Sequence, residues 1–190
     1  MLEIKKMCKI VWGNKTAVRF VLLFFISYGL LYMINYILTG LLQPGGYYSE
    51  WLANNLDYVT AFRTLLLTST ANVVELFDYY TCLRGNILFV EGGHNIRMVY
   101  SCIGINILCM WWAFVIAMPM KMKTKTVYLL AGTMCLIALN IIRLSMLTMS
   151  PNDYSYGELI IDHHTIYNWV VYGLILIVMK RVIDVVFTTK

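Results

Sequence analysis

Charged side chains are scarce in this chain. They make up 13% of the 190 residues, and hydrophobic residues make up 60%, whereas a soluble domain usually carries about 25% charged residues. The sequence also lacks acidic tracts, low-complexity tracts and internal repeats, so it shows none of the signs of a disordered or repeat protein. Long apolar runs dominate instead, and they predict one integral membrane domain covering residues 1–190.

A basic face for nucleic acid is also missing, although the net charge is +5. Lysine and arginine gather in three groups at the ends of apolar runs rather than among stacking aromatic residues. Such groups mark the cytoplasmic side of a membrane protein. We therefore expect both termini on the inner side of the cytoplasmic (inner) membrane, and residues 47–101 and 150–162 on its outer side. The groups are Lys5, Lys6, Lys9, Lys15 and Arg19, then Lys121, Lys123 and Lys125, then Lys180, Arg181 and Lys190.

Four apolar runs predict transmembrane helices at about residues 18–42, 103–120, 126–149 and 165–187. Between the first two, apolar residues recur at helical spacing opposite a row of polar ones, which predicts an amphipathic helix on the outer leaflet at about 57–80. Two β-prone runs then flank a Gly-Gly pair and predict a hairpin just before Cys102. The expected fold class is an all-α, multi-pass membrane bundle with an outer amphipathic helix and a small β-hairpin.

The five cysteines contain no metal-type pair such as C-x-x-C, and we expect neither a metal nor another cofactor. Cys102 lies where an outer loop becomes a helix, and a helix N-terminus favours the nucleophilic thiolate. A lone cysteine more often packs as a small hydrophobic residue, so this signal needs support from others. A nucleophile must stay reduced, and we therefore expect Cys102 not to form a disulfide with Cys82, the other cysteine on the outer side.

Arg143 lies inside a predicted membrane helix. An arginine there costs about 2.5–3.5 kcal/mol on insertion scales, and such residues usually face a bundle interior and are functional. The alternative is that the long side chain only reaches back to the outer interface.

His163 and His164 stand at the outer mouth of the last predicted helix, beside Asp162. Histidine suits a general acid or base because it titrates near neutral pH. A metal site would need a third ligand at suitable spacing, which is missing. The pair could also be a polar cap, with Tyr167 and Trp169 as interfacial aromatic residues.

Three predicted helices thus bring a cysteine, an arginine and a histidine to one outer surface. Cysteine acyl transfer needs a thiolate, a proton donor and acceptor, and positive charge at the developing oxyanion. The sequence therefore predicts a membrane cysteine protease or transpeptidase whose active site faces outward.

The ordered motifs resemble the exosortase/archaeosortase family, especially its short, Bacteroidetes-type members. They are Cys102-Ile103-Gly104, Asn140-Ile141-Ile142-Arg143, and His164 followed by Gly173, and the resemblance covers about residues 86–179. It implies a transpeptidase acting on C-terminal sorting segments of exported proteins. By the same resemblance Cys102 is the nucleophile, Arg143 stabilises the transition state and His164 is the general acid and base, with His163 as competitor. Ile103 and Tyr100 stand where family members often have serine and an acidic residue.

A second hypothesis is a non-catalytic membrane assembly or partner protein of an export system, in which Arg143 binds a peptide carboxylate. A small transporter fits less well, because inverted repeats and interrupted helices are missing. The expected partners are a sorting segment and membrane lipid, without nucleic acid. The sequence leaves the substrate, the acceptor nucleophile and the oligomeric state open.

Overall fold

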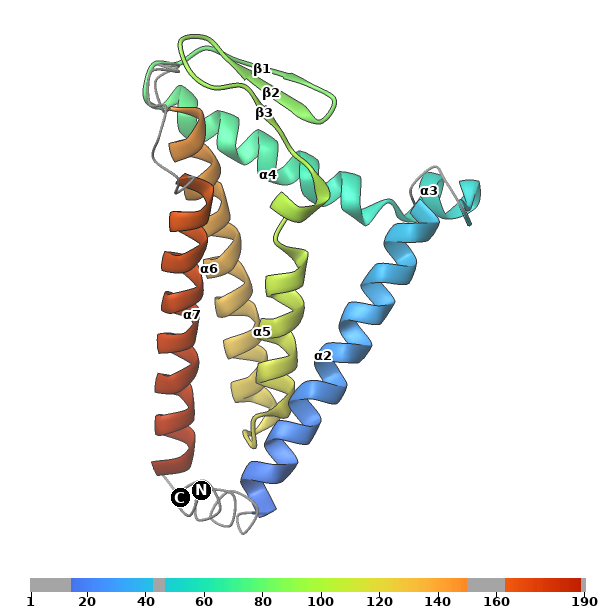
Figure 1. Cartoon of the computed structure of the whole chain (residues 1–190), viewed down its shortest axis with the longest axis vertical. Helices are drawn as coiled ribbons and strands as arrows, with labels where there is room; N and C mark the ends of the chain where they lie inside the picture. Colours follow the sequence, from blue (N-terminus) through green and yellow to red (C-terminus); the bar gives the residue numbers. More distant parts are fainter. Residues whose placement is uncertain (1–14, 43–46, 150–162, 189–190) are drawn as a thin grey trace, which may run out of the picture.

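The computed structural model describes residues 15–42, 47–149 and 163–188, and these are mostly helical. The helices α2, α5, α6 and α7 run along the long axis of the molecule, and α4 crosses them at one end (Figure 1). A short helix, α3, precedes α4, and a single 3-10 turn, η1, precedes α5. The bounds are α2 Lys15–Leu42, α3 Glu50–Leu56, α4 Tyr58–Glu75, η1 Tyr100–Cys102, α5 Ile105–Ala117, α6 Met122–Thr148 and α7 His163–Thr188.

A three-stranded antiparallel sheet lies at the same end of the molecule as α4 (Figure 1). Its strands β1 (Thr81–Arg84), β2 (Ile87–Val90) and β3 (Ile96–Arg97) pair in chain order. The β2–β3 hairpin confirms the prediction of a hairpin before Cys102. Strand β1 was not predicted. It joins β2 through a tight turn at Gly85, whose φ of 60° is the left-handed conformation that a two-residue hairpin turn needs.

Helix α4 lies within the range predicted for the amphipathic helix, although it ends at Glu75 rather than near residue 80, and its place on the outer leaflet stays a prediction. The Asp57 side chain caps its start by accepting a hydrogen bond from the backbone N–H of Thr60 at 2.9 Å. Leu66, Leu67 and Val74 are buried on its inner face, against the sheet and α6. The predicted polar face is exposed, at Thr60, Thr64, Thr68 and Glu75.

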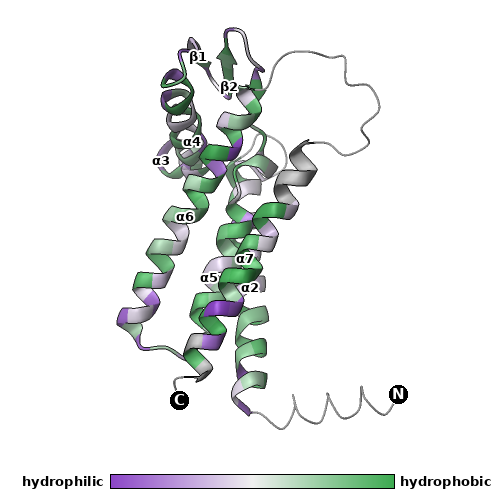
Figure 2. Ribbon diagram, turned by 90° about the vertical axis from the view of Figure 1, so that its left-hand side faces the viewer, coloured by the Kyte–Doolittle hydropathy of each residue, from purple (hydrophilic) through white to green (hydrophobic). Residues whose placement is uncertain are grey.

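Two helices in the described part of the chain, α2 and α6, are long and apolar enough to cross a membrane. Figure 2 shows α2, α5 and α6 as mainly hydrophobic along their middle parts. The expected helix at 103–120 is shorter, because α5 covers only 13 residues. Gly104, with a φ of 81°, prevents an earlier start, and Met118 is extended before Pro119. Thirteen residues rise about 20 Å, less than the roughly 30 Å of a bilayer core.

Helix α5 is the central helix and packs between α2 and α6. The indole of Trp111 lies against Gly132 of α6 so closely that a Cβ on Gly132 would be 2.1 Å from the ring. Trp111 Nε1 donates to the Tyr128 carbonyl at 3.3 Å, and Trp112 Nε1 donates to Thr133 Oγ1 at 2.9 Å. These contacts fix how α5 sits along α6.

The N-terminal end of α2, the α5–α6 connection and the C-terminal end of α7 lie together, at the end of the molecule opposite the sheet (Figure 1). Lys15 and Arg19 belong to the first of these segments, and Lys121 follows α5. This arrangement is the one that the predicted topology requires, while its orientation in the membrane stays a prediction.

Candidate active site

Cys102 is the last residue of η1, and its half-buried side chain packs against the apolar core beneath the sheet. The turn is closed by two backbone hydrogen bonds. Cys102 N–H donates to the Val99 carbonyl at 3.0 Å, and Ile103 N–H donates to the Tyr100 carbonyl at 3.2 Å. The chain then passes through Gly104 into α5, so Cys102 precedes the helix instead of lying in its first turn.

Asn140 of α6 holds this turn by its backbone. Its Nδ2 donates to the carbonyls of Cys102 and Ile103, each at 3.2 Å. A Cβ on Gly104 would lie 3.4 Å from the same nitrogen. The Cys-x-Gly and Asn-x-x-Arg motifs are therefore in direct contact, which the sequence alone did not show.

Arg143 lies one helical turn beyond Asn140 on α6. Three residues advance a helix by about 4.5 Å and return to nearly the same face. The next residue, Leu144, is 2% exposed and packs in the same apolar core as Ile103. Arg143 itself is half-buried. The face of α6 that carries Asn140 and Leu144 thus lies against the Cys102 turn, and Arg143 is the residue next to Leu144 on this helix.

The Cys102 turn is recessed in the bundle rather than placed at its rim. Asn140 stands eight residues before Thr148, the last residue of α6, which is about 12 Å of helix. Above it, the β2–β3 loop closes on the end of α6: His94 N–H donates to the Thr148 carbonyl at 2.8 Å. A Cβ on Gly93 would be 2.3 Å from the same oxygen, so only glycine allows this approach.

His163 and His164 are the first two residues of α7. This helix begins at the end of the bundle that carries the sheet (Figure 1). The side chains of both histidines, and Asp162, lie outside the part of the chain that the structure describes. The role of His164 and its competition with His163 therefore stay predictions.

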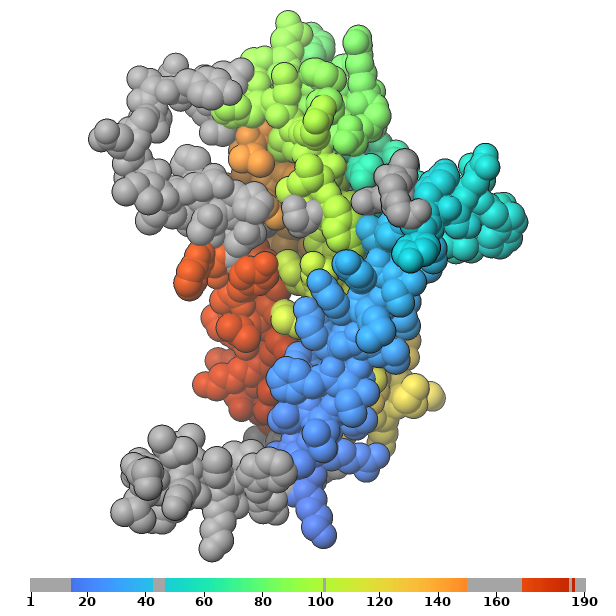
Figure 3. Space-filling view, turned by 45° about the vertical axis from the view of Figure 1, so that its right-hand side comes forward, coloured from blue at the N-terminus to red at the C-terminus, as the bar shows by residue number. Residues whose placement is uncertain are grey.

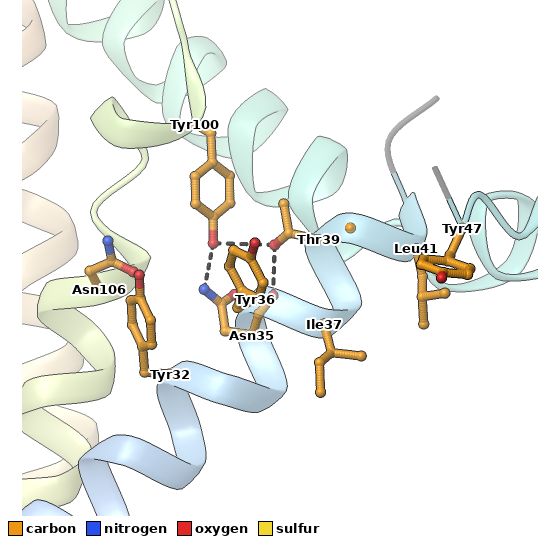
Figure 4. Close-up of a pocket in the computed structure, with 10 residues that line it drawn as sticks. Tyr32, Asn35, Tyr36, Ile37, Thr39, Leu41, Tyr47, Tyr100 and Asn106 are labelled. Atoms are coloured by element: carbon orange, nitrogen blue, oxygen red, sulfur yellow. Dashed lines mark hydrogen bonds between the residues drawn. The ribbon is translucent and has the colours of Figure 1, made fainter. Parts of the chain in front are cut away.

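A second set of polar contacts reaches the Cys102 turn from α2, and the sequence did not reveal it. Asn35, only 7% exposed, donates from Nδ2 to the hydroxyl of Tyr100, the first residue of η1 (Figure 4). Tyr58 of α4 donates to Asn35 Oδ1 at 2.8 Å, and Thr39 Oγ1 lies 3.2 Å from the Tyr100 hydroxyl. Burial raises the pKa of Tyr58, so its hydroxyl stays protonated and can donate. The signals that could have found this set are an asparagine inside an apolar run and a tyrosine two residues before Cys102.

A cavity of about 730 Å³ lies beside these residues, between α2 and the start of α5. Asn35 and Tyr100 contribute to its wall, together with Asn106 and with Tyr32 and Tyr36 of α2 (Figure 4). None of the described lining residues is charged. Figure 3 shows the face on which the yellow-green segment leading into α5 lies between α2 in blue and α7 in red.

Cys82, on β1, and Cys102 are both free cysteines in the structure. Among the side chains that the structure describes, which do not include those of His163 and His164, no group of three histidine, cysteine or acidic residues could hold a metal ion.

A family model described as transmembrane exosortase (Exosortase_EpsH) matches residues 11–180. The match includes Cys102, Asn140, Arg143 and His164, and it extends through α2 with Asn35. No curated protein and no solved structure matches the chain.

Proposed function

Since the chain belongs to the transmembrane exosortase family, we propose that it is a membrane cysteine transpeptidase or protease. It processes C-terminal sorting segments of exported proteins at the outer side of the cytoplasmic membrane. The observation that carries this proposal is the pair of hydrogen bonds from Asn140 to the carbonyls of Cys102 and Ile103. They join the residue proposed as nucleophile to the helix that bears Arg143.

The proposed reaction runs through a thioester. His164 accepts the proton of the Cys102 thiol, and Sγ attacks the carbonyl carbon of the scissile peptide bond while the carbonyl oxygen takes up the electron pair. His164 then returns the proton to the leaving amine as the C–N bond breaks. Water or an amine next attacks the thioester, loses its proton to His164 and releases Cys102.

Arg143 is proposed to stabilise the negative oxygen formed in both steps. Cysteine and serine acyl-transfer enzymes often use backbone N–H groups near the nucleophile for this purpose. Here the N–H groups of Cys102 and Ile103 already donate to Val99 and Tyr100 inside the η1 turn. These two N–H groups are therefore engaged, and the guanidinium one turn beyond Asn140 is suited to supply positive charge.

Thiol labelling from the outer side of intact cells tests this proposal. The reagent is a small membrane-impermeant methanethiosulfonate, and the rates are separated with Cys82→Ala and Cys102→Ala variants. Cys82 is exposed and Cys102 is half-buried, so accessibility alone would make Cys82 the faster thiol. An activated Cys102 reacts faster despite its burial. A slower Cys102 would favour the non-catalytic assembly or partner protein instead.

A further inference from the structure

Asn35 joins three parts of the fold at one point. It lies in α2, and its side-chain amide contacts Tyr58 of α4 through Oδ1 and Tyr100 of η1 through Nδ2. Polar side chains inside an apolar membrane helix are costly, and they tend to be kept where they bond to a neighbouring helix or serve a function. Tyr100 is 65 residues away in the chain but only two residues before Cys102.

The Tyr100 phenol anchors the same turn that carries the thiol. Tyr100 provides the carbonyl that accepts from Ile103 N–H, so its backbone is part of the hydrogen-bonded ring around Cys102. Asn140 holds the other side of this ring from α6. The turn is thus hydrogen-bonded to Asn35 of α2 on one side and to Asn140 of α6 on the other (Figure 4 shows the α2 side).

The orientation of the Asn35 amide is defined by its neighbours. The Tyr58 hydroxyl donates at 2.8 Å to Oδ1, which leaves Nδ2 as the atom that faces Tyr100. Because burial raises the pKa of Tyr58, this donor does not change with pH in the working range. In this arrangement the Tyr100 hydroxyl accepts from Asn35 Nδ2.

We propose that Asn35 and Tyr100 are positioning residues. They hold the Cys102 turn so that its thiol lies where it can attack the carbonyl carbon of the substrate. This inference rests on the proposed function, because it assigns these residues a role in the reactivity of the same nucleophile. Neither residue is placed in contact with the reacting atoms. Both act through the backbone of the η1 turn.

The experiment measures the rate at which Cys102 reacts with the impermeant methanethiosulfonate, as a function of pH, with Cys82 in the same protein as reference. The variants are Tyr100→Phe, which removes one oxygen, Asn35→Leu, and the double variant. Tyr36→Phe is the matched control. Tyr36 is a tyrosine of α2 that is 70% exposed, whereas the side-chain amide of Asn35 forms its hydrogen bonds with Tyr58 and Tyr100. Thermal unfolding in detergent verifies that each protein is folded.

We expect Tyr100→Phe and Asn35→Leu each to lower the labelling rate of Cys102 by roughly three- to tenfold, which corresponds to the net free energy of one hydrogen bond. The double variant should slow the reaction of Cys102 by less than the product of the two single effects, because both changes remove the Asn35–Tyr100 bond. The pH profile of Cys102 should change, while the rate of Cys82 and the Tyr36→Phe control stay as in the unmodified protein. A purely structural role would lower the unfolding temperature without this selective change at Cys102.

An unchanged rate and pH profile for Cys102 in folded Tyr100→Phe protein would overturn the positioning role and leave the proposed function standing. Tyr100→Phe decides alone if Asn35→Leu does not fold. A Cys102 that is no faster than Cys82 in the unmodified protein would instead count against the proposed function, and the positioning role would fall with it. The two failures therefore give different results.

Discussion

The side-chain amide of Asn140 donates to the backbone carbonyl of Cys102 at 3.2 Å, across a sequence separation of 38 residues. The same nitrogen reaches the Ile103 carbonyl, so one side chain satisfies two acceptors of the turn. Loss of this donor would leave two part-buried carbonyls without the Asn140 hydrogen bond, and the position of Cys102 would no longer be tied to the helix of Arg143.

Asn140→Leu tests this connection. We expect the free energy of unfolding to fall by about 1–3 kcal/mol, because the two carbonyls lose their donor. Processing should fall by about 10², the size of effect that a small misplacement of a reacting group can have. Asn72→Leu is the control, since Asn72 is an exposed asparagine of α4. Equal loss of processing in both variants would show that the Cys102 turn does not depend on Asn140.

Gly104→Ala tests the backbone of the same turn. A residue with a Cβ in the left-handed conformation costs about 1–2 kcal/mol, and here the Cβ would also lie 3.4 Å from Asn140 Nδ2. Gly92→Ala is a matched control, because Gly92 has a φ of 79° and nothing within 4 Å of its Cβ position. Both variants should lose stability in thermal unfolding, but only Gly104→Ala should lose processing. Loss of processing in both would contradict a specific role for the turn.

The predicted topology is tested with reporter fusions at Lys123 and Asn152. The lysine groups beside the membrane segments predict that Lys123 lies inside and Asn152 outside. The two reporters should therefore be active on opposite sides of the membrane. Activity on the same side would contradict the outward-facing site.

Much of the helical framework could be predicted from the sequence, since long apolar runs mark α2 and α6 and the Gly-Gly pair marks the β2–β3 hairpin. The start of α5 could not, because the left-handed Gly104 that separates η1 from the helix shows itself only in the folded backbone. Strand β1 was missed because its four residues are half-buried or exposed and lack an apolar alternation. Strand pairing with β2 is what makes it a strand.

Some residues of the candidate site could likewise be predicted from the sequence, and others could not. Cys102 and Arg143 stood out as residue types in unusual places, a cysteine at a loop–helix junction and an arginine in an apolar run. Asn35 and Tyr100 did not, because each is ordinary by itself and their bond joins positions 65 residues apart. Only the packing of α2 against the α5 end of the bundle brings them together.

The proposed role of Arg143 depends on the planar pair of N–H donors of its guanidinium, and a comparison of Arg143→Lys with Arg143→Ala tests it. If the side chain only reached the interface, lysine would substitute, because it can do the same. A lysine ammonium does not reproduce the planar pair of donors of a guanidinium, so we expect both variants to lose about 10²–10³ in processing rate. Arg97→Lys, at an exposed position on β3, is the control and should retain full processing. Full processing by Arg143→Lys would refute the proposed role.

The central claim is that Cys102 performs the cleavage, and mass spectrometry of the C-termini of surface proteins tests it most directly. Cells carrying the unmodified protein, Cys102→Ala and Cys82→Ala are compared at equal membrane levels of the three proteins. The account predicts a set of exported proteins that lose their C-terminal segments with the unmodified and Cys82→Ala proteins and retain them with Cys102→Ala. The same C-termini in all three strains would contradict it.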